Sequence, residues 1–320
     1  MELPLRLRQA IEAALHAAPL SEIAADARAL SDRYRGEVRD GRLHVSSERM
    51  ARAYVAARMP ATYAAIHASL SALADRLPGF APASLLDVGA GPGTTLWAAA
   101  DIWPDLKSAT LLEASADMRA MGHRLAADVF PDADWKAADA LRDNAGGDAD
   151  LVTLAYVLDE LAPHDRKPLL DRLWRQARTA LVIVEPGTPA GWQRILDARD
   201  QLIAAGAHIL APCPHAHACP ILAPDWCHFS ARVARSRIHR LAKGADVPWE
   251  DEKFACLVAS RAPAAPSPAR VLAPPEPASG RVRLKLCQPD GTALHRLVTR
   301  REGDAFRSAR RVDWGDLFDG

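Results

Sequence analysis

The chain has 320 residues, of which 49% are hydrophobic and 6% aromatic, so it can bury a core larger than one minimal domain needs. Forty Lys and Arg residues balance forty Asp and Glu residues, which excludes binding to nucleic acid through net charge alone. No apolar run is long enough to cross a bilayer, and the first residues lack a signal or transit pattern. We therefore expect a cytoplasmic protein that has no membrane partner.

Residues 1–80 are expected to form an N-terminal helical region. Apolar side chains such as Ile11 and Leu15 recur at helical spacing, and a second helical run follows the cap-like Ser47. Pro60 should break or kink this second run. The pattern indicates a helical cap that shields the rest of the fold or contacts a partner.

From residue 81 to 210 the pattern alternates between strand and helix. Such alternation is typical of an α/β fold with a doubly wound, mostly parallel sheet covered by helices on both faces. The candidate strands are 84–88, 108–113, 134–138, 150–155 and 180–185, and the candidate helices between them are 94–101, 116–127, 164–177 and 189–207.

A glycine-rich turn joins the first candidate strand to its helix and reads Gly89-Ala90-Gly91-Pro92-Gly93. Glycines let the backbone approach a ligand closely, and the following helix offers free N–H groups. A dinucleotide site needs a small residue where this chain has Thr94. Asp87 at the strand end suits a cationic ligand better than a pyrophosphate. The turn therefore favours S-adenosylmethionine, although glycine turns also serve helix packing alone.

Acidic and polar residues end the next strands, where ligands of doubly wound sheets bind. Glu113 is placed to accept both ribose hydroxyls, and Asp139 to meet an adenine amino group. Each also has a structural interpretation, as a first-turn acid or a surface turn. Their order on successive strands favours the cofactor. The residues of the expected cofactor site are Asp87, Gly89, Ala90, Gly91, Gly93, Glu113, Asp139 and Tyr156.

A cysteine-rich insert at 211–250 follows this sheet. Cys213, Cys219 and Cys227 lie within fifteen residues among prolines, so we expect a loop whose thiolates converge on a metal. Cys287 is the best candidate for the fourth ligand, with a histidine or Cys256 as alternatives, although Cys256 suits a core thiol. The spacing differs from that of zinc knuckles, yet zinc remains an alternative.

A basic stripe that lacks acids follows the last cysteine of the insert. Its position favours contact with phosphates, and a solvated helix face is the alternative. Beyond it we expect a return strand at 251–261, a Pro-rich connector at 262–279, and a β hairpin with a basic tail at 280–320. The stripe comprises Arg232, Arg235, Arg237, Arg240 and Lys243.

The segments LLDVGAGPGT, YVLDEL, VEPGTPAGW, CPHAHACP, DWCHFSARVAR, EDEKFACLV and WGD resemble the methyltransferase-like assembly factors of the small ribosomal subunit, which occur in bacteria and mitochondria. The resemblance covers the chain from about residue 45 to the end. It implies a class I methyltransferase fold that binds S-adenosylmethionine. It also implies a 4Fe–4S cluster whose ligands by motif position are Cys213, Cys219, Cys227 and Cys287. The partners would be small-subunit rRNA and its assembly intermediates, and no DNA.

An active rRNA methyltransferase with a structural zinc or iron–sulfur site is the alternative function. The Pro-Pro-aromatic loop of adenine-amino methyltransferases is absent, because Ala155, Tyr156, Val157 and Leu158 occupy its place. Tyr156, Asp159 and Glu160 would act as acid–base groups only if a substrate came within their reach. We therefore assign no catalytic residue, and whether the protein is an enzyme stays open.

Overall fold

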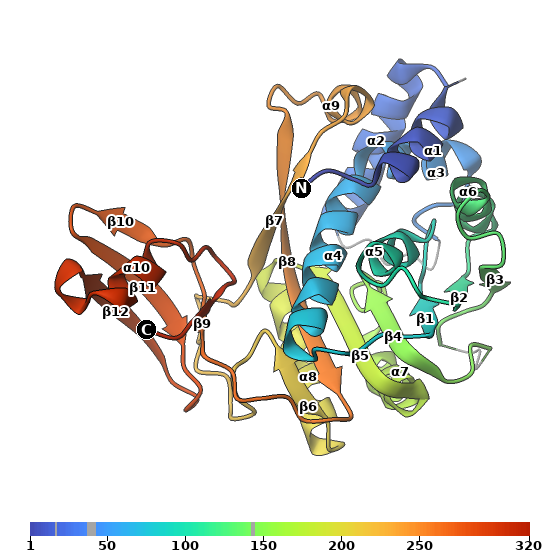
Figure 1. The fold of residues 1–320 in the computed structure, drawn as a ribbon. Coiled ribbons are helices and arrows are strands. Elements are labelled where there is room, and N and C mark those ends of the chain that lie inside the picture. The colour runs from blue at the N-terminus through green and yellow to red at the C-terminus, as the bar shows by residue number, and fades with distance from the viewer. Residues whose placement is uncertain (17, 37–42, 142–144) are drawn as a thin grey trace.

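The computed structural model describes residues 1–16, 18–36, 43–141 and 145–320 (Figure 1). The helices are α1 (Leu5–Leu15), α2 (Leu20–Arg35), α3 (Glu48–Ala57), α4 (Met59–Arg76), α5 (Thr94–Ile102), α6 (Ala116–Ala126), α7 (Pro163–Gln176), α8 (Pro189–Ala204), α9 (Arg237–Lys243) and α10 (Asp304–Ala309), with a 3-10 turn η1 (Arg300–Glu302). The strands are β1 (Ser84–Val88), β2 (Ser108–Glu113), β3 (Asp134–Ala137), β4 (Ala149–Ala155), β5 (Ala177–Pro186), β6 (His208–Ala211), β7 (Phe229–Ala234), β8 (Trp249–Ser260), β9 (Ala269–Val271), β10 (Glu276–Ala278), β11 (Arg281–Cys287), β12 (Ala293–Thr299) and β13 (Leu317–Phe318).

The larger sheet has the strand order β3-β2-β1-β4-β5-β8-β6, and β7 also pairs with β8. Strands β1 to β5 run parallel, whereas β8 runs antiparallel to β5, β6 and β7. The order reverses between β1 and β4, which is where doubly wound sheets bind ligands. The prediction of a doubly wound, mostly parallel sheet is confirmed.

Two hydrophobic cores lie on opposite faces of this sheet, because successive side chains of a strand point to opposite sides. Leu85 and Val182 face the core that they share with α4, whereas Leu86 and Leu181 face the core that they share with α7 and α8. Both faces are therefore covered by helices, as Figure 1 shows.

The N-terminal region is helical, as expected, and α4 packs along β7 and β8 (Figure 1). Pro60 lies in the first turn of α4, where a missing N–H costs nothing, so the expected break falls between α3 and α4. None of the helices in the described ranges is long and apolar enough to cross a membrane.

The C-terminal residues form a separate small sheet with the order β10-β11-β9-β13, in which β12 pairs with β11 (Figure 1). The expected hairpin is present as β11 and β12. The segment 262–279 differs from the expected connector, because it contributes β9 and β10 to this sheet. Pro277 lies in β10, which is an edge strand, and there one side makes no ladder hydrogen bonds. We call residues 269–320 the C-terminal lobe.

Candidate functional site

The glycine turn between β1 and α5 has the backbone that its sequence suggests. Gly89 and Gly91 have positive φ angles of 72° and 54°, which side chains other than glycine adopt only at a cost. A Cβ on Gly89 would lie 2.3 Å from Cγ2 of Val157, so no larger residue fits there. The backbone N–H groups of Gly89 and Ala90 donate to the carbonyl of Leu112, at 2.9 and 3.0 Å.

Glu113 at the end of β2 holds this turn in place. Its Oε2 accepts the N–H of Gly91 at 2.9 Å, and its Oε1 accepts the N–H of Ser115 at 2.7 Å. A carboxylate has about four acceptor positions, so these two hydrogen bonds do not saturate it. Burial raises the pKa of Glu113, and the two backbone hydrogen bonds oppose that rise.

A cavity of about 1040 Å³ opens at the ends of β1, β2 and β4. Its lining includes Gly89, Gly91, Glu113, Asp139 and Tyr156, so five of the eight predicted cofactor residues meet at one place. The order of these residues on successive strands is the signal that locates them.

The other three predicted cofactor residues, Asp87 before the turn and Ala90 and Gly93 within it, contact the protein interior. Asp87 is buried and accepts the hydroxyl of Thr153 at 2.6 Å, and burial raises its pKa to about 7. Gly93 faces Trp135, because a Cβ there would lie 2.8 Å from the indole ring. Ala90 is buried in the core that α4 shares with the sheet. None of the three is among the residues that line the cavity.

The residues that enclose the other side of the cavity carry no local sequence signal. Tyr34, Tyr54 and Arg58 reach it from the N-terminal helices, and Glu252 reaches it from β8. Arg58 lies 4.0 Å from Glu252 and over the ring of Tyr34. These residues come from segments remote from the glycine turn, so the helical region forms one wall of the site.

Tyr156 has an unusual backbone and a partly buried hydroxyl. Its φ angle of 59° is rare outside glycine, and its hydroxyl donates to Oε1 of Glu252 at 3.2 Å. Burial, and then the charge of Glu252, raise the pKa of Tyr156 well above its ordinary value. Tyr156 therefore remains a neutral hydrogen-bond donor at neutral pH and cannot act there as a general base.

Six acidic side chains line the cavity, and three of them, Glu113, Asp159 and Glu160, act on one another's pKa. Burial, and then the charges of Asp159 and Glu113, raise the pKa of Glu160 to about 8. His44 lies 3.7 Å from Glu160. A cationic ligand would relieve the repulsion between these three acids. Elsewhere in the lining, positive charge is carried by Arg28, Arg58, Lys243 and Lys253.

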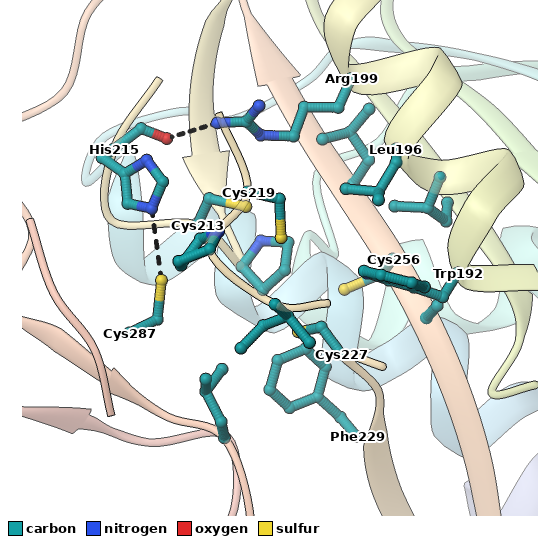
Figure 2. Close-up of a pocket in the computed structure, with 17 residues that line it drawn as sticks. Trp192, Leu196, Arg199, Cys213, His215, Cys219, Cys227, Phe229, Cys256 and Cys287 are labelled. Atoms are coloured by element: carbon teal, nitrogen blue, oxygen red, sulfur yellow. Dashed lines mark hydrogen bonds between the residues drawn. The ribbon is translucent and has the colours of Figure 1, made fainter. Parts of the chain in front are cut away.

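The second candidate site is built from the cysteine-rich loop between β6 and β7 and from β11 (Figure 2). Figure 2 shows Cys213, Cys219, Cys227 and Cys287 around one small cavity, which Cys256 on β8 also lines. Sγ of Cys287 lies 3.3 Å from Nε2 of His215. The C-terminal lobe thus supplies a cysteine to a loop that lies 60 residues earlier in the chain.

Two buried arginines flank these cysteines, and the sequence did not point to either of them. Arg199 on α8 is 1% exposed and donates to the carbonyls of His215 and His217 at 3.0 and 2.6 Å. Its Nε has no partner among the described residues, and its acidic neighbour Asp200 is 75% exposed. A buried cation with so little compensation favours an anionic neighbour.

Arg270 on β9 is the second buried cation, at 7% exposure. It donates to the carbonyl of Pro212 at 2.9 Å and to that of Gly315 at 2.7 Å. In the described part of the chain no carboxylate forms an ion pair with it. Burial raises the pKa of Cys213, while Arg199 and Arg270 act in the opposite direction.

The cysteines of this cavity are compatible with two kinds of metal group. Four cysteines are the ligand set of a four-iron cluster, and they are also a ligand set of structural zinc. Among the described residues, no group of three or more His, Cys, Asp and Glu side chains already has the arrangement of a metal-ion site. The donor set therefore fits either group.

The predicted basic stripe is largely compensated within the protein. Antiparallel pairing of β7 with β8 puts Arg232 opposite Asp251, and their side chains form a hydrogen-bonded ion pair at 2.7 Å. Arg235 and Lys243 both pair with Glu250 on β8. The sequence run lacks acids because the acids come from the next strand.

Arg237 and Arg240, which lie on α9 within the stripe, are exposed. Arg240 donates to the carbonyl of Asp246 at 3.3 Å. Two of the five predicted phosphate-binding side chains therefore remain outside any ion pair seen in the described ranges, and nucleic-acid binding by the stripe stays a prediction.

The strand order, the glycine turn and the cavity beside it define a protein with a class I methyltransferase-like fold. The chain belongs to the Rsm22 family, because the family described as mitochondrial small ribosomal subunit Rsm22 matches residues 48–319. The resemblance to methyltransferase-like small-subunit assembly factors is thereby confirmed.

Two relatives are similar in sequence to most of this chain. The human ribosome assembly protein METTL17, mitochondrial, is 31% identical over an alignment of 297 residues, which covers 85% of this chain and 63% of that protein. The Rsm22-cox11 tandem protein 2, mitochondrial, of Schizosaccharomyces pombe is 26% identical and matches 83% of this chain and 42% of that protein. The chain thus spans less than two thirds of either relative. Both names contain the word mitochondrial, so a cytoplasmic location finds no support there.

Solved structures resemble the chain only in outline. Magnesium protoporphyrin IX methyltransferase from Synechocystis has a TM-score of 0.42 and 15% identity, with 72% of this chain and 91% of that one covered. A putative RNA methyltransferase from Pyrococcus horikoshii has a TM-score of 0.40 and 13% identity, with coverage of 61% and 80%.

Proposed function

We propose that this protein assists assembly of the small ribosomal subunit by binding its rRNA. It would bind S-adenosylmethionine in the large cavity and hold a structural 4Fe–4S cluster on Cys213, Cys219, Cys227 and Cys287. The assembly role draws support from membership of the Rsm22 family and from the name of the human relative.

One observation carries the cluster proposal: four cysteines from two distant segments line one cavity that is flanked by buried arginines lacking buried carboxylate partners. Four thiolates and a 4Fe–4S cluster together are anionic, so Arg199 and Arg270 would compensate their charge. The cluster would cross-link the insert to the C-terminal lobe and stabilise a loop that has little regular structure.

Support for S-adenosylmethionine comes from the residues of the large cavity. Glu113 would accept the ribose hydroxyls, Asp139 would accept the adenine amino group, and Gly89 and Gly91 would allow close backbone approach. Glu160 and the acids beside it would favour the positive charge of the ligand's sulfonium. The ligand carries a transferable methyl group on its sulfonium. Tyr156, which lines the cavity, is unsuited to act as a base. We therefore propose that the cavity binds the ligand, and we assign no catalytic group.

The proposal is tested by iron, sulfide and zinc analysis of protein purified without oxygen, together with sedimentation alongside ribosomal particles. About four irons per chain and an absorption band near roughly 400 nm are expected. Co-sedimentation with immature small subunits is expected as well. One zinc without iron would overturn the cluster, and sedimentation only as free protein would overturn the assembly role.

The affinity for S-adenosylmethionine is expected to rise with pH between 7 and 9. Because the pKa of Glu160 is raised to about 8, this carboxyl is mostly neutral at pH 7 and mostly ionised at pH 9. The ionised form attracts a cation, so we expect up to about a tenfold gain. Calorimetric titration of the parent and of Glu160→Gln at several pH values measures it.

At each pH the dissociation constant of Glu160→Gln is divided by that of the parent, so that any titration of the ligand itself cancels. Titration of Asp159, Glu113 and His44, which are present in both proteins, contributes to both constants. A ratio that does not change with pH would contradict the role of Glu160.

A further inference from the structure

The outer face of the C-terminal sheet ends in a group of arginines. Val282, Leu284 and Leu286 on β11 point into the core of the lobe, so Arg281 and Arg283 point to the opposite face. In the register of β11 with β12, Arg281 lies opposite Thr299 and Arg283 lies opposite Leu297.

Two more arginines extend this end of the sheet. Arg300 and Arg301 follow β12 directly, and the N–H of Arg300 donates to the carbonyl of Gly280 at 2.9 Å. This hydrogen bond fixes Arg300 beside the start of β11. We call Arg281, Arg283, Arg300 and Arg301 the arginine edge.

The charges of the arginine edge are largely free. Arg281, Arg300 and Arg301 are exposed, and within the described ranges no carboxylate forms an ion pair with any of them. Arg283 lies 3.7 Å from Glu276, and the two side chains are 59% and 69% exposed. An ion pair so exposed is weak and easily exchanged for another anion. The edge thus differs from the basic stripe, in which Arg235 and Lys243 pair with the half-buried Glu250.

The opposite end of the same sheet face is closed by the protein itself. Lys285 forms an ion pair with Asp225 of the cysteine-rich loop, and Cys287 approaches His215. The lobe is therefore attached at one end and presents the arginine edge at the other. In Figure 1 the lobe stands away from the larger sheet, so the edge is open to a large partner.

The chemistry of the edge suits phosphates. All four cations are arginines, whose planar guanidinium groups bind phosphate oxygens in pairs. Leu297, 48% exposed, and the exposed His295 lie on the same face and offer contacts to sugars and bases. A protein partner would need a matching acidic surface, whereas RNA carries a phosphate at every nucleotide.

We propose that the arginine edge binds the phosphate backbone of RNA without reading its sequence. This inference rests on the proposed assembly function and adds the surface through which the protein contacts rRNA. It assigns the contact to the C-terminal lobe in addition to, or in place of, the basic stripe.

The test compares two triple variants of the full chain that lose the same charge from the same lobe. Arg281→Gln, Arg300→Gln and Arg301→Gln remove three of the four cations of the edge, and Arg283 stays. Arg307→Gln, Arg310→Gln and Arg311→Gln remove exposed arginines in and after α10 and form the matched control. The probes are two fluorescent RNA hairpins of unrelated sequence and a DNA hairpin, titrated between 50 and 200 mM salt.

The edge variant is expected to bind both RNAs on the order of tenfold more weakly at low salt. Its log–log salt dependence should be shallower by about 0.9 for each phosphate that the variant no longer neutralises. The control variant should bind within about twofold of the parent, because it keeps the edge. Unchanged iron content and melting temperature would show that both variants are folded.

If both variants bound RNA equally more weakly than the parent, the proposal would be overturned, because the net positive charge of the lobe would then account for binding. Unchanged affinity in the edge variant, with RNA binding by the parent intact, would also overturn it while leaving the assembly function standing. A parent that binds no RNA would overturn both. Equal or tighter binding of the DNA hairpin would overturn the assignment to RNA, because it would show that the edge binds the phosphates of any duplex.

Discussion

Cys219→Ser is expected to remove iron from the protein and to lower its stability. Cys219 lines the cavity together with Cys213, Cys227 and Cys287, and a hydroxyl is a poor substitute for a thiolate at a soft metal. Because the cluster would join the insert to the C-terminal lobe, its removal resembles the removal of a native cross-link. We expect the free energy of unfolding to fall by about 2–5 kcal/mol. Iron analysis, absorption near roughly 400 nm and thermal unfolding measure the effect.

Cys256→Ser is the matched control for that variant. Cys256 lines the same cavity, but it lies on β8 and belongs to the hydrophobic core of the sheet. This variant should keep its iron and its absorption band. Iron loss in Cys256→Ser with retention in Cys219→Ser would reverse the ligand assignment.

Gly91→Arg is expected to abolish measurable binding of S-adenosylmethionine. Gly91 lines the large cavity with a φ angle of 54°, and a Cβ there would lie 3.3 Å from Cε of Met118. An arginine at this position strains the turn, adds a positive charge and disturbs the hydrogen bond from Gly91 to Glu113. We expect affinity to fall about a hundredfold or more, which calorimetry measures.

Gly79→Arg controls for backbone strain in the previous variant. Gly79 has a φ angle of 89° and open space around its Cα, so it shares the left-handed backbone but lies outside the cavity. It should bind S-adenosylmethionine as the parent does. Binding by Gly91→Arg within twofold of the parent would remove the turn from the cofactor site. Normal ribosomal particles in cells that carry only Gly91→Arg would show that assembly does not need the cofactor.

The fold was predictable because strand and helix patterns alternate cleanly from β1 to α8. Residues at strand ends, such as Glu113 and Asp139, reach the same cavity, because parallel strands end at one edge of the sheet. The cysteines were likewise visible as a cluster in the sequence. Their roles as ligands stay predictions.

What the sequence could not reveal depends on contacts between distant segments. Arg58 reaches the cavity from the helical region, and Arg199 reaches the cysteines from α8, each without a local motif. The compensation of Arg235 and Lys243 by Glu250 depends on how β7 pairs with β8. The short strands β9 and β10 form in a proline-rich segment only because β11 and β13 supply partners.

Strand β8 also has a consequence for how the chain is made. It pairs with β5, β6 and β7, all of which precede it in the sequence. During synthesis these three strands leave the ribosome first, with backbone N–H and C=O groups that have no neighbour on the side that β8 will occupy. Such open edges pair readily with other chains. A chain shortened before Trp249 would keep the glycine turn and the cysteine-rich loop. It would lack β8, the strand that links β5 to β6 and β7, and would be prone to aggregate.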